Sequence, residues 1–362
     1  MSSLIAEILQ LQPYSLNKRE KENILNPHFS ALCKHHYENC MAYQKMLDAI
    51  GFDVNIDHPY SEIPFLPVRL FKLYDLVSIP KTEIFKTVTS SGTSGQSVSR
   101  IFLNKETAAN QTKVLTRIVS SFIGSQRLPM IIVDSESVIK DRNLFSARGA
   151  GIMGFSLFGS QRFFALDESM DLKTDHLFEF VHKNEGSRVL VFGFTFMVYQ
   201  HFLEQLAALG KRLDLLDAVL IHGGGWKNLQ KKSVSPVLFR ETIKKICGIT
   251  NVHDYYGMAE QTGSIFMECE KGHLHAPVYA DIIIRNPNNF SICGFGEPGI
   301  IQALSVIPES YPGHSLLTED EGILIGEDDC PCGRMGKYFQ VTGRLKEAEM
   351  RGCSDTYADS HS

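Results

Sequence analysis

The sequence lacks the features of membrane, secreted and nucleic-acid-binding proteins. Its longest apolar run covers residues 189–199, whereas a helix needs about 20 apolar residues to span a bilayer. The 36 Lys and Arg residues and 41 Asp and Glu residues give a net charge of −5, so no basic excess favours nucleic acid or an anionic membrane. The segment 1–12 has neither a basic region nor a small-residue cleavage site, and we expect no signal peptide.

Internal repeats and low-complexity blocks are also missing, and the chain has a single tryptophan. The 43% hydrophobic and 21% charged content is that of an ordinary globular protein. Eight cysteines without a secretion signal indicate thiols, a metal site or catalysis rather than disulfides. We therefore expect a cytoplasmic protein of one large domain with an appendage.

Apolar strands alternate with helices through the middle of the chain. The pattern predicts strands at 130–134, 189–193 and 218–223, and helices at 105–123, 201–209 and 236–247. Such alternation is typical of an α/β fold with parallel sheets covered by helices, whose ligands bind beyond the carboxyl ends of the strands. Nearer the amino terminus, Asn26 and Pro27 resemble a helix start, and Gly51 ends the following apolar periodicity.

A run of hydroxyl residues and glycines lies between two strand-like segments. It comprises Ser90, Ser91, Gly92, Thr93, Ser94 and Gly95. Backbone N–H groups and hydroxyls in such a loop suit a polyphosphate, and Arg100 follows as a cation. The spacing is not that of a Walker loop, and a mobile polar loop is the alternative.

This run resembles the phosphate-binding loop of the adenylate-forming (AMP-binding) superfamily. Those enzymes join a carboxylate to AMP from ATP, release pyrophosphate and pass the acyl group to a thiol. The resemblance implies that the residues 90–95 hold ATP phosphates and that Arg100 replaces the family's usual lysine.

A glycine triplet, Gly223, Gly224 and Gly225, follows the strand at 218–223. Glycines let a flat ring lie against the backbone, where N–H and C=O groups can read an adenine edge. A plain strand-to-helix turn is the alternative. The triplet with Trp226 and Lys227 resembles the bacterial bioluminescence (LuxE-type) acyl-protein synthetases of the superfamily.

Three further segments resemble superfamily motifs in the expected order. By that resemblance Tyr256 packs on adenine, and Glu260 is a catalytic residue that holds Mg²⁺ between ATP phosphates. Ala259 stands where the family has threonine, and Thr262 is a possible substitute hydroxyl. The resemblance also implies that Asp320 binds the ribose hydroxyls and that Arg344 lies near the ribose.

Eighteen residues follow Arg344 in the 362-residue chain, and we expect no full lid domain. The expected organisation is a helical region with a Pro-rich connector (1–80), an adenylation core (81–341) and a short tail (342–362). In the acyl-protein synthetases a cysteine near the end accepts the acyl group and passes it to a reductase. That resemblance makes Cys353 the catalytic thiol, and Lys346 and Arg351 would favour its thiolate. An incidental cysteine is the alternative.

A second set of cysteines suits a metal. Three sulfurs and one nitrogen fit tetrahedral Zn²⁺, and they come from Cys269, His275, Cys330 and Cys332. His273 is a competing nitrogen ligand, and unpaired or redox-active thiols are the alternatives. The segment from Cys330 to Arg334 resembles phenylacetate-CoA ligase-like proteins rather than the bioluminescence enzymes.

The sequence therefore predicts an ATP- and Mg²⁺-dependent acid–thiol ligase. We expect it to activate a carboxylic acid, most simply a fatty acid, as acyl-AMP. The acyl group then moves to the thiol of Cys353, which delivers it to a partner reductase or transferase. An aryl- or acyl-CoA ligase is the first alternative, and a nucleotide-binding scaffold without catalysis is the second. The acid and the oligomeric state do not follow from the sequence.

Overall fold

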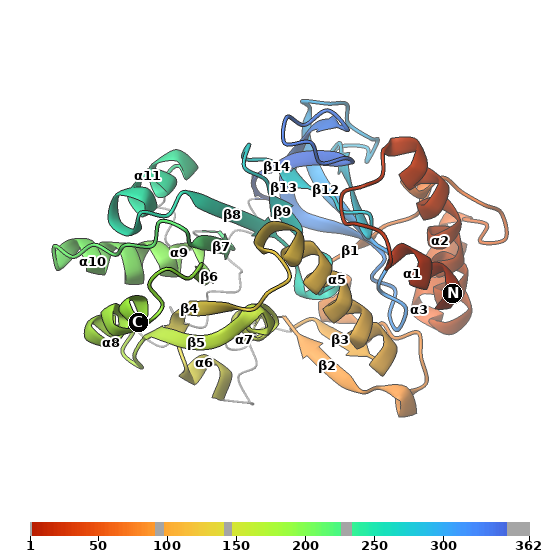
Figure 1. The fold of residues 1–362 in the computed structure, drawn as a ribbon. Helices are drawn as coiled ribbons and strands as arrows, with labels where there is room; N and C mark the ends of the chain where they lie inside the picture. The colour runs from red at the N-terminus through yellow and green to blue at the C-terminus, as the bar shows by residue number, and fades with distance from the viewer. Residues whose placement is uncertain (1, 91–97, 141–146, 226–233, 346–362) are drawn as a thin grey trace. The chain divides into compact units, whose positions relative to one another are not determined.

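The computed structural model describes residues 2–90, 98–140, 147–225 and 234–345 (Figure 1). The chain forms two units. Among the described residues, unit 1 holds 2–90, 98–121 and 257–345, and unit 2 holds 122–140, 147–225 and 234–256. Unit 1 draws on segments far apart in sequence, and the expected boundaries at 80/81 and 341/342 stay a prediction.

Unit 2 contains a parallel sheet in the order β8–β7–β6–β4–β5. The strands are β4 (Leu128–Ser135), β5 (Gly159–Leu166), β6 (Leu190–Phe194), β7 (Val219–Gly223) and β8 (Asn251–Tyr256). The three strands predicted from apolar runs are β4, β6 and β7. Parallel sheets need helical crossovers, which explains the strand–helix alternation in the sequence.

Helices cover both faces of this sheet. They are α6 (Ser137–Lys140), α7 (Ala147–Phe155), η4 (Ser156–Phe158), α8 (Thr174–Lys183), α9 (Thr195–Met197), the π-helical η5 (Val198–Leu203), α10 (Glu204–Ala208) and α11 (Pro236–Cys247). Val191 and Leu220 pack into a core shared with α8–α11. Phe192, one position along β6, faces the other way and stacks on Phe155 of α7 with ring centroids 4.2 Å apart.

Unit 1 contains an antiparallel sheet in the order β11–β12–β13–β14–β10–β9. The strands are β9 (Phe266–Glu268), β10 (Leu274–His275), β11 (Ala280–Arg285), β12 (Pro298–Ser305), β13 (Ser315–Glu327) and β14 (Lys337–Arg344), and β1 (Leu66–Pro67) pairs parallel to β13. The α/β fold class is confirmed, but the sequence predicted parallel sheets only. Short turns rather than helices join these strands, and such connections favour antiparallel pairing.

The remaining elements of unit 1 precede its sheet in sequence. They are α1 (Ser2–Ile8), α2 (Lys18–Asn39), α3 (Met41–Ile50), η1 (Tyr60–Glu62), α4 (Leu70–Leu73), η2 (Lys81–Glu83), β2 (Lys86–Thr89), β3 (Arg100–Leu103) and α5 (Lys105–Ile123, whose last two residues belong to unit 2), with η7 (Ala259–Gln261) later in the chain. The helices α2 and α3 lie side by side (Figure 1). Strands β2 and β3 form an antiparallel hairpin.

The start of the first long helix differs from the sequence prediction. Helix α2 begins at Lys18, and Asn17 caps it through a reciprocal capping box with Glu20. Pro27 therefore lies inside the helix and not at its first turn. The predicted cap residue, Asn26, instead accepts a hydrogen bond from the Tyr60 backbone N–H at 2.8 Å.

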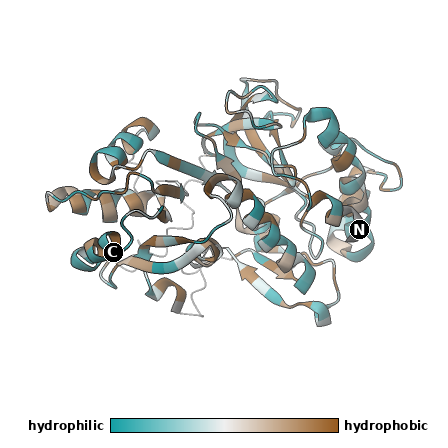
Figure 2. Ribbon diagram, in the orientation of Figure 1, coloured by the Kyte–Doolittle hydropathy of each residue, from teal (hydrophilic) through white to brown (hydrophobic). Residues whose placement is uncertain are grey.

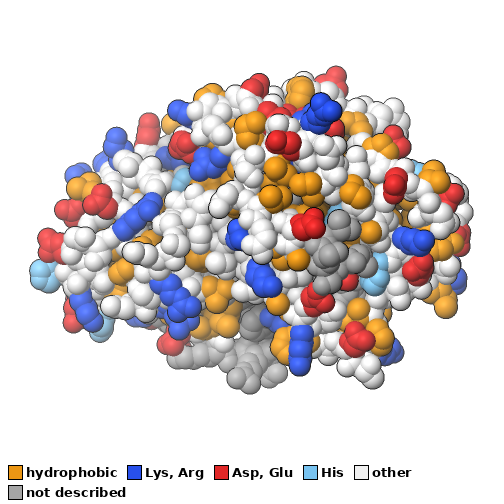
Figure 3. Space-filling model, turned by 45° about the vertical axis from the view of Figure 1, so that its right-hand side comes forward, with side chains coloured by type: hydrophobic (Ala, Val, Ile, Leu, Met, Phe, Trp, Pro, Cys, Tyr) orange, Lys and Arg blue, Asp and Glu red, His pale blue; other side chains and the backbone are white. Residues whose placement is uncertain are grey.

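Hydrophobic and hydrophilic residues both occur along α5, α8 and α11, as expected for helices with one buried face (Figure 2). On the face drawn in Figure 3, Lys and Arg side chains are interspersed with Asp and Glu. No helix among the described residues is long and apolar enough to cross a membrane.

Candidate functional site

The hairpin β2–β3 carries the predicted phosphate loop. At its base the Ser90 backbone N–H donates to the Ser99 carbonyl at 3.1 Å, and the Ser99 N–H donates to the Ser90 hydroxyl oxygen at 2.9 Å. These two bonds fix the points where the loop leaves and re-enters the hairpin. The loop residues Ser91, Gly92, Thr93, Ser94 and Gly95 lie outside the described residues.

Arg100 opens β3 directly after the loop. Its Nη2 lies 2.8 Å from Asp75 Oδ1, and both side chains are about half exposed. The predicted phosphate cation is thus paired with a carboxylate, and water weakens that pair.

Glu260 lies in the 3-10 turn η7, and unit 1 fixes that turn from several sides. The Tyr311 hydroxyl donates to the Glu260 carbonyl at 2.8 Å. The Gln261 amide donates to two carbonyls, those of Ala303 at 3.0 Å and Gly313 at 2.8 Å. The Thr262 hydroxyl, considered as a substitute for the missing threonine, donates to the Ala259 carbonyl at 2.9 Å and completes the turn.

Close packing against α5 explains the glycine after this turn. Gly263 has a φ of +92°, and a Cβ there would lie 2.6 Å from the Gln111 carbonyl oxygen. No other residue fits this backbone conformation and this spacing without displacing α5. The turn that carries Glu260 is therefore set at a fixed distance from a long helix.

The carboxyl group of Glu260 is buried, with 7% of the residue exposed. Burial raises its pKa, because the charged form loses hydration. Ser99 and Lys72 lower the pKa in opposition, and Glu319 raises it further. Ser99, at the base of the predicted phosphate loop, thus lies close enough to lower the pKa of Glu260. A divalent cation would supply the positive counter-charge that a buried carboxylate lacks.

Asp320 and Arg344 face each other across β13 and β14. Arg344 Nε lies 3.1 Å from Asp320 Oδ1, and Arg344 Nη2 lies 3.5 Å from Glu319 Oε2. Arg69 Nε also approaches Glu319, at 3.3 Å from Oε1. Two carboxylates and two guanidinium groups therefore form one partly exposed network in unit 1.

The glycine triplet lies at the carboxyl end of β7 in unit 2. A Cβ on Gly223 would lie 2.4 Å from Cε1 of Tyr255, so that tyrosine ring lies directly against the Gly223 backbone. Gly224 has a φ of +77° beside the Phe194 ring. At Gly225 no atom of the described residues lies within 4 Å of where a side chain would begin. Among these residues the flat ring on this backbone is thus that of Tyr255, at Gly223. Tyr256 ends β8 and is half-buried.

Other polar residues at this end of the parallel sheet have structural partners. The Thr195 hydroxyl lies 2.9 Å from His222 Nδ1, and burial lowers the pKa of His222 to about 3, so the ring is neutral at pH 7. Asp134 and Arg148 form a buried two-point ion pair, with N–O distances of 2.9 and 3.0 Å. These side chains order the strand ends rather than leaving free groups for chemistry.

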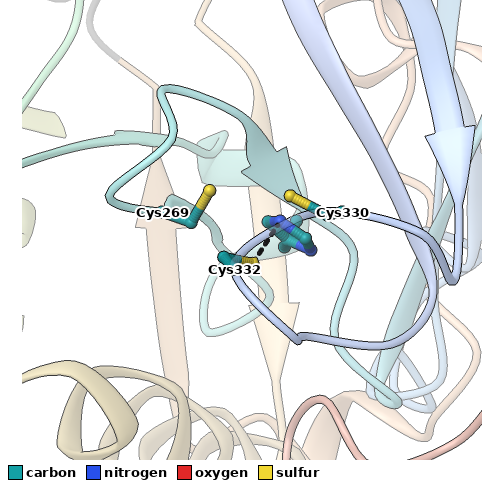
Figure 4. A group of neighbouring side chains, drawn as sticks. Cys269, Cys330 and Cys332 are labelled. Carbon is teal, nitrogen blue, oxygen red and sulfur yellow. Dashed lines mark hydrogen bonds between the residues drawn. The ribbon is translucent and has the colours of Figure 1, made fainter.

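The four residues predicted to bind zinc come together in unit 1. The ligand atoms of Cys269, His275, Cys330 and Cys332 all lie within 4.8 Å of one another. We refer to these four residues as the Cys₃His cluster (Figure 4). Cys332 Sγ lies 3.3 Å from His275 Nε2, whereas His273, the competing ligand, contacts Cys330 Sγ at 3.4 Å.

Sequence reasoning missed two neighbours of the predicted site. Ser99 closes the loop and lowers the pKa of Glu260, and Glu319 connects Arg69 to Arg344. Ser99 directly precedes Arg100, and Glu319 directly precedes Asp320. This adjacency to predicted site residues is the feature of the sequence that could have identified them. The proposed thiol, Cys353, lies outside the described residues, as do Trp226 and Lys227.

The fold is shared with solved acyl-CoA ligases. An open conformation of 2-hydroxyisobutyryl-CoA ligase in complex with 2-HIB-AMP and CoA matches with a TM-score of 0.70 and 14% identity, over 92% of this chain and 77% of that chain. A long-chain-fatty-acid-CoA ligase from Archaeoglobus fulgidus matches with a TM-score of 0.50 and 13% identity, over 74% and 52% of the two chains. At these identities the likeness establishes the fold, which is that of the adenylate-forming ligases.

The sequence itself defines the family more closely. The family model described as "Acyl-protein synthetase, LuxE" matches residues 1–361. The long-chain-fatty-acid–luciferin-component ligase of Vibrio harveyi is 22% identical over 354 residues, which cover 94% of this chain and 89% of that protein. The chain belongs to the LuxE acyl-protein synthetase family. It is a ligase, and acyl activation by adenylation is the chemistry that its family and fold support.

Proposed function

We propose that the protein converts a fatty acid and MgATP to acyl-AMP and pyrophosphate, and then transfers the acyl group to the thiol of Cys353. The observation that carries this proposal is the match of residues 1–361 to the acyl-protein synthetase family. The name of the Vibrio harveyi relative supports a long-chain fatty acid as the substrate. A reductase or transferase that accepts the acyl group is the proposed partner.

In the first step a carboxylate oxygen attacks the α-phosphorus, and the bond to pyrophosphate breaks. Ser90–Gly95 and Arg100 bind the phosphates, and Glu260 holds the Mg²⁺ that enters with ATP. The burial of Glu260 beside Ser99 supports this role, because Mg²⁺ prefers carboxylate oxygen and offsets the charge that spreads over the phosphates. Arg100 would exchange its exposed Asp75 partner for a phosphate.

The nucleoside is bound by a carboxylate at the ribose and by glycine backbone at the base. Asp320 accepts hydrogen bonds from the ribose hydroxyls, and Arg344 orients this carboxylate. Gly223, Gly224 and Gly225 with Tyr256 bind the adenine. No atom of residues 2–90, 98–140, 147–225 or 234–345 lies near the side-chain position of Gly225, and this supports the assignment, since a purine edge needs an uncovered backbone.

In the second step the sulfur of Cys353 attacks the acyl carbon, the bond to AMP breaks, and the thiol proton passes to solvent. This yields a thioester on the protein and free AMP. A thioester retains the activation of the adenylate and can be passed to a second thiol or reduced by the partner enzyme.

Two measurements test the proposal separately. Exchange of labelled pyrophosphate into ATP, run against acids from acetate to long-chain and aryl acids, reports the first step. Labelled acid with ATP, followed by gel analysis, reports the thioester. We expect the Cys353→Ser variant to retain exchange and to lose the protein-bound label, whereas Ser354→Ala, the matched control, retains both. Label that persists in Cys353→Ser would contradict the role of this thiol.

A CoA ligase is the competing function, since the Cys330–Arg334 segment resembles phenylacetate-CoA ligase-like proteins. In that case CoA accepts the acyl group directly, and the Cys353→Ser enzyme supplied with CoA forms acyl-CoA at the wild-type rate. An absence of exchange with every acid would instead favour a nucleotide-binding scaffold.

A further inference from the structure

The Cys₃His cluster joins two separate turns of unit 1. Cys269 lies in the turn between β9 and β10, and His275 is the last residue of β10, so both belong to the β9–β10 hairpin. Cys330 and Cys332 belong to the turn between β13 and β14. Figure 4 shows the three labelled cysteines on these loops around one shared space, with a dashed line from Cys332 to the imidazole.

The spacing of the ligand atoms fits a tetrahedral metal. Zinc–sulfur bonds of about 2.3 Å place the corners of a tetrahedron about 3.8 Å apart. The four atoms of the cluster lie within 4.8 Å of one another before any metal draws them together. Three of the four residues are buried, and all three cysteines are free thiols, so neither solvent nor a disulfide accounts for the arrangement.

Both turns also direct backbone N–H groups at sulfur. The Lys271 N–H donates to Cys269 Sγ at 3.4 Å, and the Arg334 N–H donates to Cys332 Sγ at 3.4 Å. In each turn the donor is two residues after the cysteine, so the same local geometry occurs twice. Hydrogen bonds to sulfur favour the thiolate, which is the form that binds metals.

The side chains around the cluster support the same interpretation. Tyr338 stacks on His273 and His275, with ring centroids 4.9 and 5.6 Å apart. Arg334 pairs with Glu270 at 2.8 Å across the two turns and lies over the Tyr14 ring at 5.8 Å. Three thiolates with Zn²⁺ carry a net charge of −1, and the nearby guanidinium group offsets it.

We propose that the Cys₃His cluster binds one zinc ion as a structural site. Four protein ligands close the coordination sphere and leave no position for a substrate, which distinguishes structural from catalytic zinc. The ion would fasten the β13–β14 turn to the β9–β10 turn. The same β13–β14 hairpin carries Asp320 and Arg344 towards its other end.

Metal analysis of the purified full-length protein tests this inference without any measurement of activity. We expect about one zinc per chain, and replacement by Co²⁺ should give the intense visible absorption and sulfur-to-metal charge transfer of a tetrahedral thiolate site. The Cys332→Ser variant should retain less than about a fifth of the zinc. The matched control is Cys293→Ser, which alters a buried thiol of the same unit outside the cluster and should retain the full amount.

If Cys332→Ser fails to fold, the Co²⁺ spectrum of the wild-type protein still tests the inference, because it reports the thiolate ligands without a variant. Protein purified without chelators that contains no metal, takes up no Co²⁺ and exposes all cluster thiols to a thiol reagent after mild unfolding would overturn the inference. Iron in place of zinc would overturn the identity of the metal. Both results are independent of acyl transfer, because the readout is metal content.

Discussion

Arg344 Nε lies 3.1 Å from Asp320 Oδ1, and the two residues occupy directly paired positions on β14 and β13. The guanidinium group of Arg344 contacts one oxygen of the Asp320 carboxylate and so holds that carboxylate in one orientation. Such an oriented carboxylate is suited to accept hydrogen bonds from two adjacent hydroxyls, as in a ribose.

The first prediction concerns this pair. Asp320→Asn removes charged hydrogen bonds worth about 1.5–3 kcal/mol each, so the KM for ATP should rise at least about 10-fold. Pyrophosphate exchange at varied ATP concentration measures this effect. The control is Glu321→Gln on the next position of β13, which pairs with Gly343 rather than with Arg344 and which should leave the KM unchanged. An equal rise in both variants would argue against a ribose contact.

The second prediction separates activity from stability at Glu260. Glu260→Gln keeps the shape of the side chain but weakens metal binding, and exchange activity should fall about 100-fold or more, since a metal supplies several kcal/mol of charge stabilisation. The folded protein should nevertheless become more stable at neutral pH. Burial raises the pKa of Glu260 above its ordinary value of 4.5, so the folded wild type loses stability as this carboxyl ionises.

The pH dependence has a definite sign. Below pH 4.5 the carboxyl is protonated in the folded and unfolded states, and the wild type and Glu260→Gln should have equal free energies of unfolding. The advantage of the variant should grow from pH 4.5 upwards and level off above the folded-state pKa. Urea unfolding between pH 4 and 8 measures the difference. If the free energy of unfolding of the variant, relative to that of the wild type, were lower at pH 8 than at pH 4.5, the raised pKa of a buried Glu260 carboxyl would be contradicted.

Local signals explain which elements the sequence predicts well. The bounds of α5 and α11 agree with the predicted 105–123 and 236–247. Ser235 caps α11, Pro236 occupies its first turn, and Gly248 ends it with a φ of 73°. These cap residues act on backbone groups within a few positions, so a single sequence contains the whole signal.

Long-range contacts explain what the sequence did not predict. Asn26 and Pro27 have the local form of a helix start, but Asn26 bonds to Tyr60, 34 residues away, and the cap is Asn17. The antiparallel sheet of unit 1 pairs β10 with β14, which lie more than 60 positions apart. Of the site, the grouping of Cys269, His275, Cys330 and Cys332 followed from residue type. The closeness of Ser99 to Glu260, which lowers the pKa of that carboxyl, required the folded chain.

The third prediction tests the contact between Gly223 and Tyr255. A methyl group at Gly223 would lie 2.4 Å from the tyrosine ring, which Phe155 also contacts at a centroid distance of 5.0 Å. Because the ring cannot move away freely, Gly223→Ala should destabilise the protein by about 1–3 kcal/mol. Gly225→Ala is the matched control, since no atom in the described part of the chain lies within 4 Å of its added methyl group. Urea unfolding of the two variants checks the difference, and equal midpoints would contradict the packing.

The last prediction concerns the buried ion pair of Asp134 and Arg148, whose side chains are 1% and 10% exposed. Arg148→Met leaves the Asp134 carboxylate without its cation and should destabilise the protein by about 3–5 kcal/mol at pH 7. Burial raises the pKa of Asp134 and Arg148 lowers it, so the variant carboxyl should take up a proton at a higher pH than in wild type.

Two outcomes follow for this pair. The loss of stability in Arg148→Met should shrink as the pH falls from 8 to 5, because protonation of Asp134 removes the unpaired charge from the folded state. The double variant Asp134→Leu/Arg148→Met should regain most of the loss at pH 7, since a buried pair replaced by apolar side chains is often neutral or stabilising. Urea unfolding of both variants at each pH measures these effects. A double variant as unstable as the single one would show that the pair contributes through packing and not through charge.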